Sequence, residues 1–214
     1  MQLVSPALPV GGFTYSQGLE WAVEAGWIRT TDDLEAWLAD QLETALCRLD
    51  VPLLLRMQAA VTAGDTEALA RWTDRLLAAR ETSELRAEEA NRGRALADLL
   101  AALDLPEPGK WQPLLARSQA AGFAFAAAAW EIPPRTAALG YVWAWLENLV
   151  LAGVKLVPLG QTQGQRILES RIGAIPALVE GTLNLKDRDI GAASPALAIA
   201  ASAHETQYTR LFRS

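Results

Sequence analysis

Apolar side chains in this sequence recur with the period of an α-helix, and this spacing constrains the fold more than any other feature. Thr30 and Asp33 have the spacing of a capping box, which marks a helix start. The apolar stripe that follows predicts one buried helix face and consists of Leu34, Trp37, Leu38, Leu42, Ala45, Leu46 and Leu49. No stretch shows the period-2 alternation of β-branched residues that is typical of a strand. The sequence therefore predicts an all-α protein.

Proline, glycine and capping residues divide the chain into separate helices. We expect an extended segment over residues 1–13, followed by a short helix that Ser16 caps and Gly26 ends. Pro52 lacks the N–H that a helix interior requires, so the helix that follows Asp33 is expected to end or kink there. Further helices are expected at 53–61, after an N-cap at Asp65, at 83–103, 114–130, 135–154 and 168–183, and from Ser194 onward.

The chain is expected to form a single compact multi-helix domain over residues 1–214. Its 51% apolar content suits one core at this length. Residues 106–113 form the longest interior break, but we expect no domain boundary there. Residues 135–154 are apolar nearly all round, so the core or a dimer interface should cover both faces of this helix and bury Trp143. Glu147 within the stretch argues against a membrane span.

Composition narrows the expected location and the class of partner. The net charge of −6 disfavours nucleic acid as a partner, because binding to phosphates requires clustered Lys and Arg. Cys47 is the single cysteine, so no intrachain disulfide can form and a cytoplasmic location is expected. The first residues lack a basic flank and a long apolar run, and we do not expect a signal peptide.

Sequence motifs for catalysis or for a bound cofactor are missing. The only histidine, His204, is followed four residues later by Tyr208 and not by a second histidine, so the zinc-protease motif fails. The chain contains no G-x-x-x-x-G-K-[ST] nucleotide-binding loop, and Ser16 lacks the glycine spacing of a nucleophile elbow. We therefore expect no catalytic residue, no metal site and no cofactor, and we interpret the chain as a protein that is not an enzyme.

The titratable residues have plain structural interpretations. His204 is interpreted as a half-buried helical histidine that bonds to a backbone carbonyl, and Cys47 as a buried small apolar residue. The charged residues 84–94 are expected to face water or a partner. Two carboxylate pairs at i,i+4 spacing are interpreted as solvated helix faces, namely Glu20 with Glu24 and Glu84 with Glu88.

The last residues, 205–214, combine aromatic, aliphatic and cationic side chains and are expected to form a docking tail. Chain ends fray unless something holds them. In a partner's groove, Tyr208 and Phe212 would be the anchors and the arginines would meet carboxylates. Docking to a partner and packing back on the chain's own domain are both open from composition alone.

Four separated stretches of the sequence resemble the UreF family of urease accessory proteins. They are QLVSPALPVGGFTYSQGLEWAVEAG at 2–26, RETSELRAEEANRG at 80–93, AGVKLVPLGQ at 152–161 and DIGAASPALAIAASAHETQYTRLFRS at 189–214. The resemblance implies an all-α homodimer that binds the accessory protein UreD (also called UreH), the GTPase UreG and apo-urease. In this family the assembly serves GTP-dependent nickel insertion into the urease active site. The chain would modulate the GTPase without being one.

The resemblance also implies which residues bind partners. The tail and the His204-Glu205 pair match the family's C-terminal motif, and Lys155 matches the lysine of its VKLVP segment and would face the GTPase. By itself, Lys155 could equally lay its stem along a helix end, and the glycines of the matching loop at 9–13 could serve only a turn. The candidate partner-binding residues are Pro9, Gly11, Gly12, Lys155, His204, Glu205, Tyr208, Arg210, Leu211, Phe212, Arg213 and Ser214.

A second hypothesis comes from a different class of protein. The chain would be a helical small-ligand-binding protein or an enzyme whose cleft is lined by carboxylates such as Glu20, Glu24 or Glu147. Co-purification separates the two hypotheses. A scaffold forms a stable complex with UreD, whereas an enzyme or ligand binder shows turnover or ligand binding as the isolated chain.

Overall fold

The computed structural model describes residues 2–103, 105, 108–191 and 194–214, and over these ranges it contains helices and no strand. The predicted all-α fold is confirmed. The α-helices are α1 Leu19–Glu24, α2 Thr31–Gln41, α3 Val51–Thr62, α4 Thr66–Ala78, α5 Ser83–Ala102, α6 Pro108–Leu115, α7 Gln119–Ala129, α8 Pro134–Leu156, α9 Gln161–Ile172, α10 Ile175–Leu183 and α11 Pro195–His204. The short 3-10 helices are η1 Gln2–Val4, η2 Gly12–Thr14 and η4 Asp187–Asp189, and η3 Leu42–Asp50 is a π-helix.

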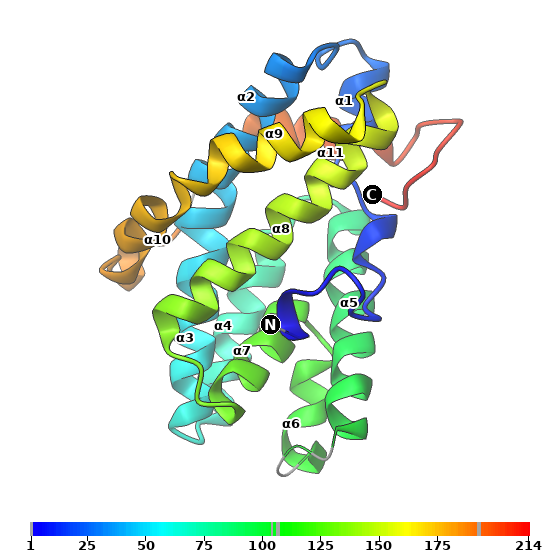
Figure 1. Cartoon of the computed structure of the whole chain (residues 1–214). Coiled ribbons are helices and arrows are strands. Elements are labelled where there is room, and N and C mark those ends of the chain that lie inside the picture. The colour runs from blue at the N-terminus through cyan, green and yellow to red at the C-terminus, as the bar shows by residue number, and fades with distance from the viewer. Residues whose placement is uncertain (1, 104, 106–107, 192–193) are drawn as a thin grey trace.

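Helix α7 lies inside the bundle, where α3 and α5 pack against it and the long helix α8 crosses the same bundle (Figure 1). Nearly all of its side chains are buried, and most of them are alanines. Small side chains let helix backbones approach closely. At Gly93 of α5, a Cβ atom would lie 2.7 Å from backbone atoms of Ser118, the N-cap of α7. The alanine-rich stretch therefore forms the inner, packed helix that its composition predicts.

Pro52 does not end the helix, so one of the two outcomes expected there, a helix end, is wrong. Helices α2, η3 and α3 run on without a break, and the π-helix places Val51 N–H on the carbonyl of Leu46. In a regular α-helix, residue 52 would donate to the carbonyl of Arg48, which proline cannot do. That carbonyl instead accepts the N–H of Gly191 at 2.9 Å. A residue far along the chain thus satisfies the acceptor, and the helix continues.

Most predicted helix caps are confirmed. Thr30 and Asp33 form the capping box of α2, and Asp65 accepts from Ala68 N–H at the start of α4. Ser194 caps α11. Two predicted helices are each divided in two: 114–130 is split where Ser118 caps α7, and 168–183 is split between α9 and α10. Pro176 at the start of α10 cannot donate to the last turn of α9, which explains the second split.

The N-terminal residues differ from the predicted extended segment in local detail. Two single turns of 3-10 helix, η1 and η2, lie within or next to it, and η1 packs on α8. Met1 lies outside the described residues. Helix α1 begins at Leu19 and its N-cap is Gly18, with φ of 77°. Ser16 is therefore not the cap: its buried hydroxyl accepts the N–H of Glu20 at 3.3 Å and donates to the carbonyl of Ser214 at 2.6 Å.

Helix α8 is, within the described ranges, the one helix long and apolar enough to cross a membrane by length and composition. Half of its most apolar window is buried inside the fold, which is the behaviour of a core helix. Trp143 is only half-buried, contrary to the prediction, because it lines an open apolar groove together with Leu139 and Ile132. The helix thus has one face in the core and one face along this groove.

Candidate docking site around the C-terminal tail

The C-terminal tail, residues 205–214, folds back on the chain's own helices. It leaves α11 as a loop and returns beside α5 (Figure 1). The N–H of Ser16 donates to the carbonyl of Ser214 at 2.7 Å, and the N–H of Arg213 donates to the carbonyl of Thr14 at 2.8 Å. Of the two possibilities that composition left open, the structure shows packing on the same domain.

Two carboxylates hold the tail in place. The Oε1 atom of Glu20 accepts the N–H of Leu211 at 2.6 Å, and its Oε2 atom accepts the N–H of Phe212 at 2.9 Å. The carboxylate of Glu84, on α5, accepts from the guanidinium of Arg210. The prediction that Glu20 and Glu84 line solvated helix faces is therefore wrong. The spacing of residues along one helix cannot predict contacts with a segment that is distant in the sequence.

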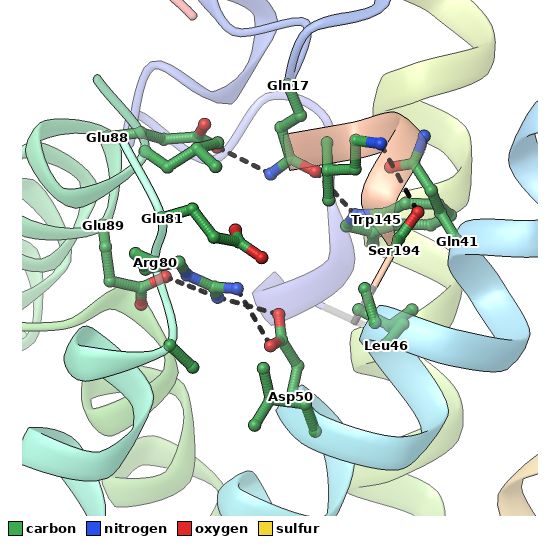
Figure 2. A pocket seen from close by; sticks show the side chains of 15 residues that line it. Gln17, Gln41, Leu46, Asp50, Arg80, Glu81, Glu88, Glu89, Trp145 and Ser194 are labelled. Atoms are coloured by element: carbon green, nitrogen blue, oxygen red, sulfur yellow. Dashed lines mark hydrogen bonds and ion pairs between the residues drawn. The ribbon is translucent and has the colours of Figure 1, made fainter. Parts of the chain in front are cut away.

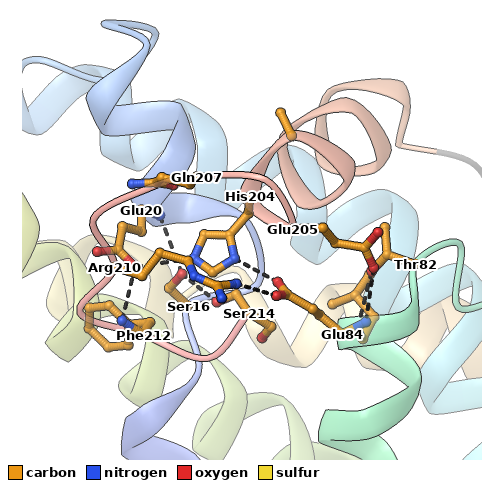
Figure 3. A network of polar contacts seen from close by, with 12 residues as sticks. Ser16, Glu20, Thr82, Glu84, His204, Glu205, Gln207, Arg210, Phe212 and Ser214 are labelled. Atoms are coloured by element: carbon orange, nitrogen blue, oxygen red, sulfur yellow. Dashed lines mark hydrogen bonds and ion pairs between the residues drawn. The ribbon is translucent and has the colours of Figure 1, made fainter.

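His204 joins these two carboxylates (Figure 3). The side chain has no exposed surface. Its Nε2 atom lies 3.1 Å from Glu20 Oε2 and its Nδ1 atom lies 2.7 Å from Glu84 Oε2. The ring is fully buried and bonds carboxylates, so the prediction of a half-buried ring bonded to a backbone carbonyl is wrong on both points. The ring connects α1, α5 and α11 at the point where the tail begins.

Glu205 fixes the tail to the start of α5. Its Oε1 atom accepts the N–H of Ser83 at 2.8 Å and the hydroxyl of Ser83 at 2.6 Å. It also accepts the N–H of Glu84 at 3.2 Å. The hydroxyl of Ser83 and the free N–H groups of the helix start lower the pKa of Glu205. This carboxylate is therefore held as an anion at the end of α11.

The tail side chains divide into an inner and an outer set. Phe212 is only 5% exposed, and the ammonium of Lys155 lies 5.7 Å from the centre of its ring. Tyr208 is fully exposed and Leu211 is 67% exposed. Tyr208 and Phe212, the two expected anchors, follow α11 in non-helical conformations and do not lie on one helix face. Tyr208 and Leu211 are thus the apolar side chains that a partner can reach.

The predicted loop at the N-terminus adjoins the same site. Gly11 has φ of 69°, a conformation that favours glycine, and it precedes η2. Gly12 begins η2, which ends at Thr14, the residue that pairs with Arg213. Pro9 is exposed. The structure therefore brings the loop, Lys155, His204 and the tail to one region of the molecule.

A buried charged cluster that was not predicted from the sequence lies next to this region. Arg80 bonds Asp50 at 2.8 Å and Glu89 at 3.0 Å (Figure 2). Arg92 bonds Glu88 at 2.7 Å. These side chains are largely buried, so the prediction that residues 84–94 face water or a partner is wrong for this face of α5. The position of Asp50 directly after the apolar stripe of its helix could have indicated that this carboxylate is buried and paired with a cation.

Burial controls the protonation of this cluster. Loss of solvation raises the pKa of Asp50, although Arg80 acts against the shift. The same burial acts on Glu89, but there Arg80, the N–H of Ala120 and the hydroxyl of Ser118 outweigh it and lower the pKa. The cavity that the cluster lines has a volume of about 40 Å³. This space suits roughly three water molecules and is too small for a metabolite.

Other candidate reactive groups are dispersed. Burial raises the pKa of the Cys47 thiol to about 11, as expected of a buried, unreactive residue. Burial also raises the pKa of Glu147, which lines a pocket to which neither Glu20 nor Glu24 contributes. Over the described ranges, no group of three or more His, Cys, Asp and Glu side chains is arranged to hold a metal ion. Glu147 therefore does not share this pocket with the other two carboxylates of the second hypothesis.

Fold and site together define an all-α protein with a buried charged cluster and a C-terminal tail that is ordered at the surface. The UreF family model matches residues 28–171. A relative from Pseudomonas putida (strain W619), named urease accessory protein UreF, is 53% identical over 214 residues, which cover all of this chain and 96% of the relative. Proteins of the same name from Alcanivorax borkumensis and from Azoarcus sp. are 50% and 52% identical, with 96% and 94% of their lengths covered and all of this chain. The chain belongs to the UreF family of urease accessory proteins.

Proposed function

We propose that this chain is a scaffold for nickel insertion into urease. It binds UreD and the GTPase UreG on apo-urease, acts as a cytoplasmic homodimer and modulates the GTPase without a reaction of its own. Family membership supports the urease role. One structural observation carries the docking proposal: a tail whose backbone N–H groups bond the buried carboxylate of Glu20 presents Tyr208 and Leu211 to solvent.

The physical argument for docking at the tail is preorganisation. A disordered segment loses conformational entropy when it binds, whereas a segment already held in place loses much less. Tyr and Arg side chains are enriched among residues that dominate interface energies. Arg210 and Arg213 are exposed near Tyr208 and Leu211, and Phe13 adds a further exposed ring beside Thr14, to which Arg213 is bonded. This combination suits a partner surface with an apolar groove and carboxylates.

Reconstitution from purified components tests the proposed function. Tagged chain is mixed with UreD, UreG and apo-urease, and the complex is isolated by size-exclusion chromatography with light scattering. The proposal predicts co-elution with the partner proteins, a dimeric free chain, and a change in GTP hydrolysis by UreG when the chain is added. Turnover or tight ligand binding by the isolated chain, together with no co-elution, would support the enzyme or ligand-binding hypothesis instead.

A further inference from the structure

We propose that a cavity beneath the N-terminal segment, residues 2–13, binds a small neutral carboxamide. The carbonyl of this ligand accepts a hydrogen bond from Arg92, and its N–H donates one to Asn148. The segment packs on α8 and runs toward α5 (Figure 1), and the cavity between them has a volume of about 260 Å³. Ligand pockets usually measure about 300–1,000 Å³, so this one suits a small molecule. Such binding would be a further function, independent of the docking role proposed above.

Arg92 supplies donors that the protein does not use. Its Nη1 atom bonds Glu88 at 2.7 Å. Over the described residues, its Nε atom is buried without a hydrogen-bond partner and its Nη2 atom makes no hydrogen bond. Nη2 lies 3.6 Å from the position that a Cβ atom at Gly12 would take, and both residues line the cavity. Because a guanidinium only donates, the ligand must place an acceptor there, such as a carbonyl oxygen.

Two amide side chains complete the polar part of the cavity. Gln119 is only 8% exposed, and its side chain makes no hydrogen bond to any part of the chain that the structure describes. Buried amides are normally paired, so this one is a free group for a ligand. Asn148 Nδ2 donates to the carbonyl of Tyr15 at 3.5 Å, while Oδ1 lies 3.5 Å from the same Cβ position at Gly12. Oδ1 can therefore accept a ligand N–H near Arg92.

The charges around the cavity select a neutral ligand. Glu88 already neutralises Arg92, so a carboxylate ligand would bring an unpaired negative charge into a largely buried site. Glu147 also lines the cavity, and within the described ranges no cation pairs with it. An ammonium ligand would offer no acceptor to Arg92. A carboxamide has a carbonyl acceptor and N–H donors without a net charge, so it matches both sides of the site.

The other walls of the cavity are apolar and indicate the rest of the ligand. They include Leu3, Val4, Leu8, Val10, Phe13 and Leu151. A short aliphatic chain on the carboxamide would bury its surface against these side chains. Among the described residues, the N-terminal segment forms hydrogen bonds only within residues 2–15. It can therefore move aside without breaking a hydrogen bond to α5 or α8, which gives a ligand a route into the cavity.

Titration of the full ¹⁵N-labelled chain with pentanamide tests the site, and the N–H signals of Gly12 and of the Gln119 side chain report on it. We expect saturable shifts with a Kd on the order of 1 mM, given the free energy per atom that small ligands reach. Pentanoate and pentylammonium have nearly the same size and should bind at least about tenfold more weakly. N-acetylglutamine methylamide carries the same group on a peptide. Tighter binding of this compound than of pentanamide would support the site and identify a protein side chain as the source, whereas weaker binding would support a free amide.

Gly12→Ala tests the position of the ligand. The added Cβ atom would meet Asn148 Oδ1 and Arg92 Nη2 at ordinary contact distances, so the fold should persist while both groups are covered. We expect pentanamide to bind this variant at least about tenfold more weakly, because it loses the hydrogen bond to the guanidinium. Gly173→Ala, where a Cβ atom meets nothing within 4 Å, is the control and should bind like wild type.

Two results would overturn the proposal: no saturable shift with pentanamide up to its solubility limit, or equal binding of pentanamide and either ion. The wild-type titrations decide this even if Gly12→Ala fails to fold. Unchanged binding of pentanamide to a folded Gly12→Ala chain would also overturn it. All these measurements use the isolated chain, so their failure is distinct from a failure of partner docking.

Discussion

At the scale of single residues, Arg80 is the side chain on which the buried charged cluster depends most directly. It bonds Asp50 and Glu89, and all three side chains are largely buried. Arg80→Met would leave two buried carboxylates unpaired, so we expect the free energy of unfolding in urea to fall by about 3–5 kcal/mol. Arg71→Met is the matched control, because Arg71 lies 3.9 Å from Glu67 with both side chains exposed, and it should change stability by less than about 0.5 kcal/mol. Equal effects of the two substitutions on the free energy of unfolding would contradict the role of Arg80 in neutralising the buried carboxylates.

Glu89 makes part of the stability depend on pH. Its folded pKa lies below the ordinary value of 4.5, so its ionised form contributes stability above that pH, and this is lost as pH falls through the folded pKa. Asp50 changes the stability in the opposite direction. Burial raises its pKa, so its protonated form contributes stability, and this contribution is lost as pH rises. We expect Glu89→Gln to be less stable than wild type at pH 7 and the difference to narrow below about pH 4. Chemical denaturation at both pH values measures this, and a constant difference would count against it.

At the scale of elements, we expect the same substitution, glycine to alanine, to have opposite effects on stability at two helix positions. Gly93→Ala would place a Cβ atom 2.7 Å from the backbone of Ser118 and push α5 away from α7. We expect this to lower the free energy of unfolding by about 1–3 kcal/mol or more. Gly181→Ala, within α10, meets no atom within 4 Å and should raise it by about 0.5–1 kcal/mol. Thermal denaturation of both variants decides the matter, and a stabilising Gly93→Ala would show that the helices are not in close contact there.

Local chemistry predicted most element boundaries, because caps and breakers act within a few residues. The capping box at Thr30 and the N-caps at Asp65 and Ser194 are confirmed for this reason. The continuous helix through Pro52 could not be predicted, since its freed carbonyl bonds to Gly191, more than a hundred residues later in the sequence. The ion pairs of Glu84 escaped prediction in the same way, because His204 and Arg210 reach it from the other end of the chain.

At the scale of the whole molecule, the tail is part of the folded structure. Phe212 belongs to the apolar core, and Ser214 bonds Ser16 and Glu88. We expect deletion of residues 210–214 to leave helical content nearly unchanged, because no helix lies within them. The deletion should lower the melting temperature by roughly 4–16 °C, equivalent to about 2–4 kcal/mol at this chain length. A far-UV circular dichroism spectrum measures the helical content, and its change on heating gives the melting temperature. An unchanged melting temperature would mean that the tail is not packed on the helices.

The resemblance in sequence predicted a docking region, but not which of its side chains face solvent. The loop at 9–13, Lys155 and the tail do lie in one region of the molecule. Composition could not show that Phe212 points inward and Leu211 outward, because this depends on the backbone path that Glu20 imposes. The orientation of tail side chains is a property of the whole fold.

The affinity of UreD or UreG for variants of the tail tests the docking proposal most directly. Tyr208→Ala with Leu211→Ala removes exposed side chains and leaves every tail backbone bond in place, so stability should not change. We expect binding to weaken by about 30-fold or more for at least one of the two partners, as for a loss of about 2 kcal/mol at an interface. Ile172→Ala, at an exposed apolar position on α9, is the control and should bind like wild type. Wild-type affinity of the double variant for both partners would contradict docking through the tail.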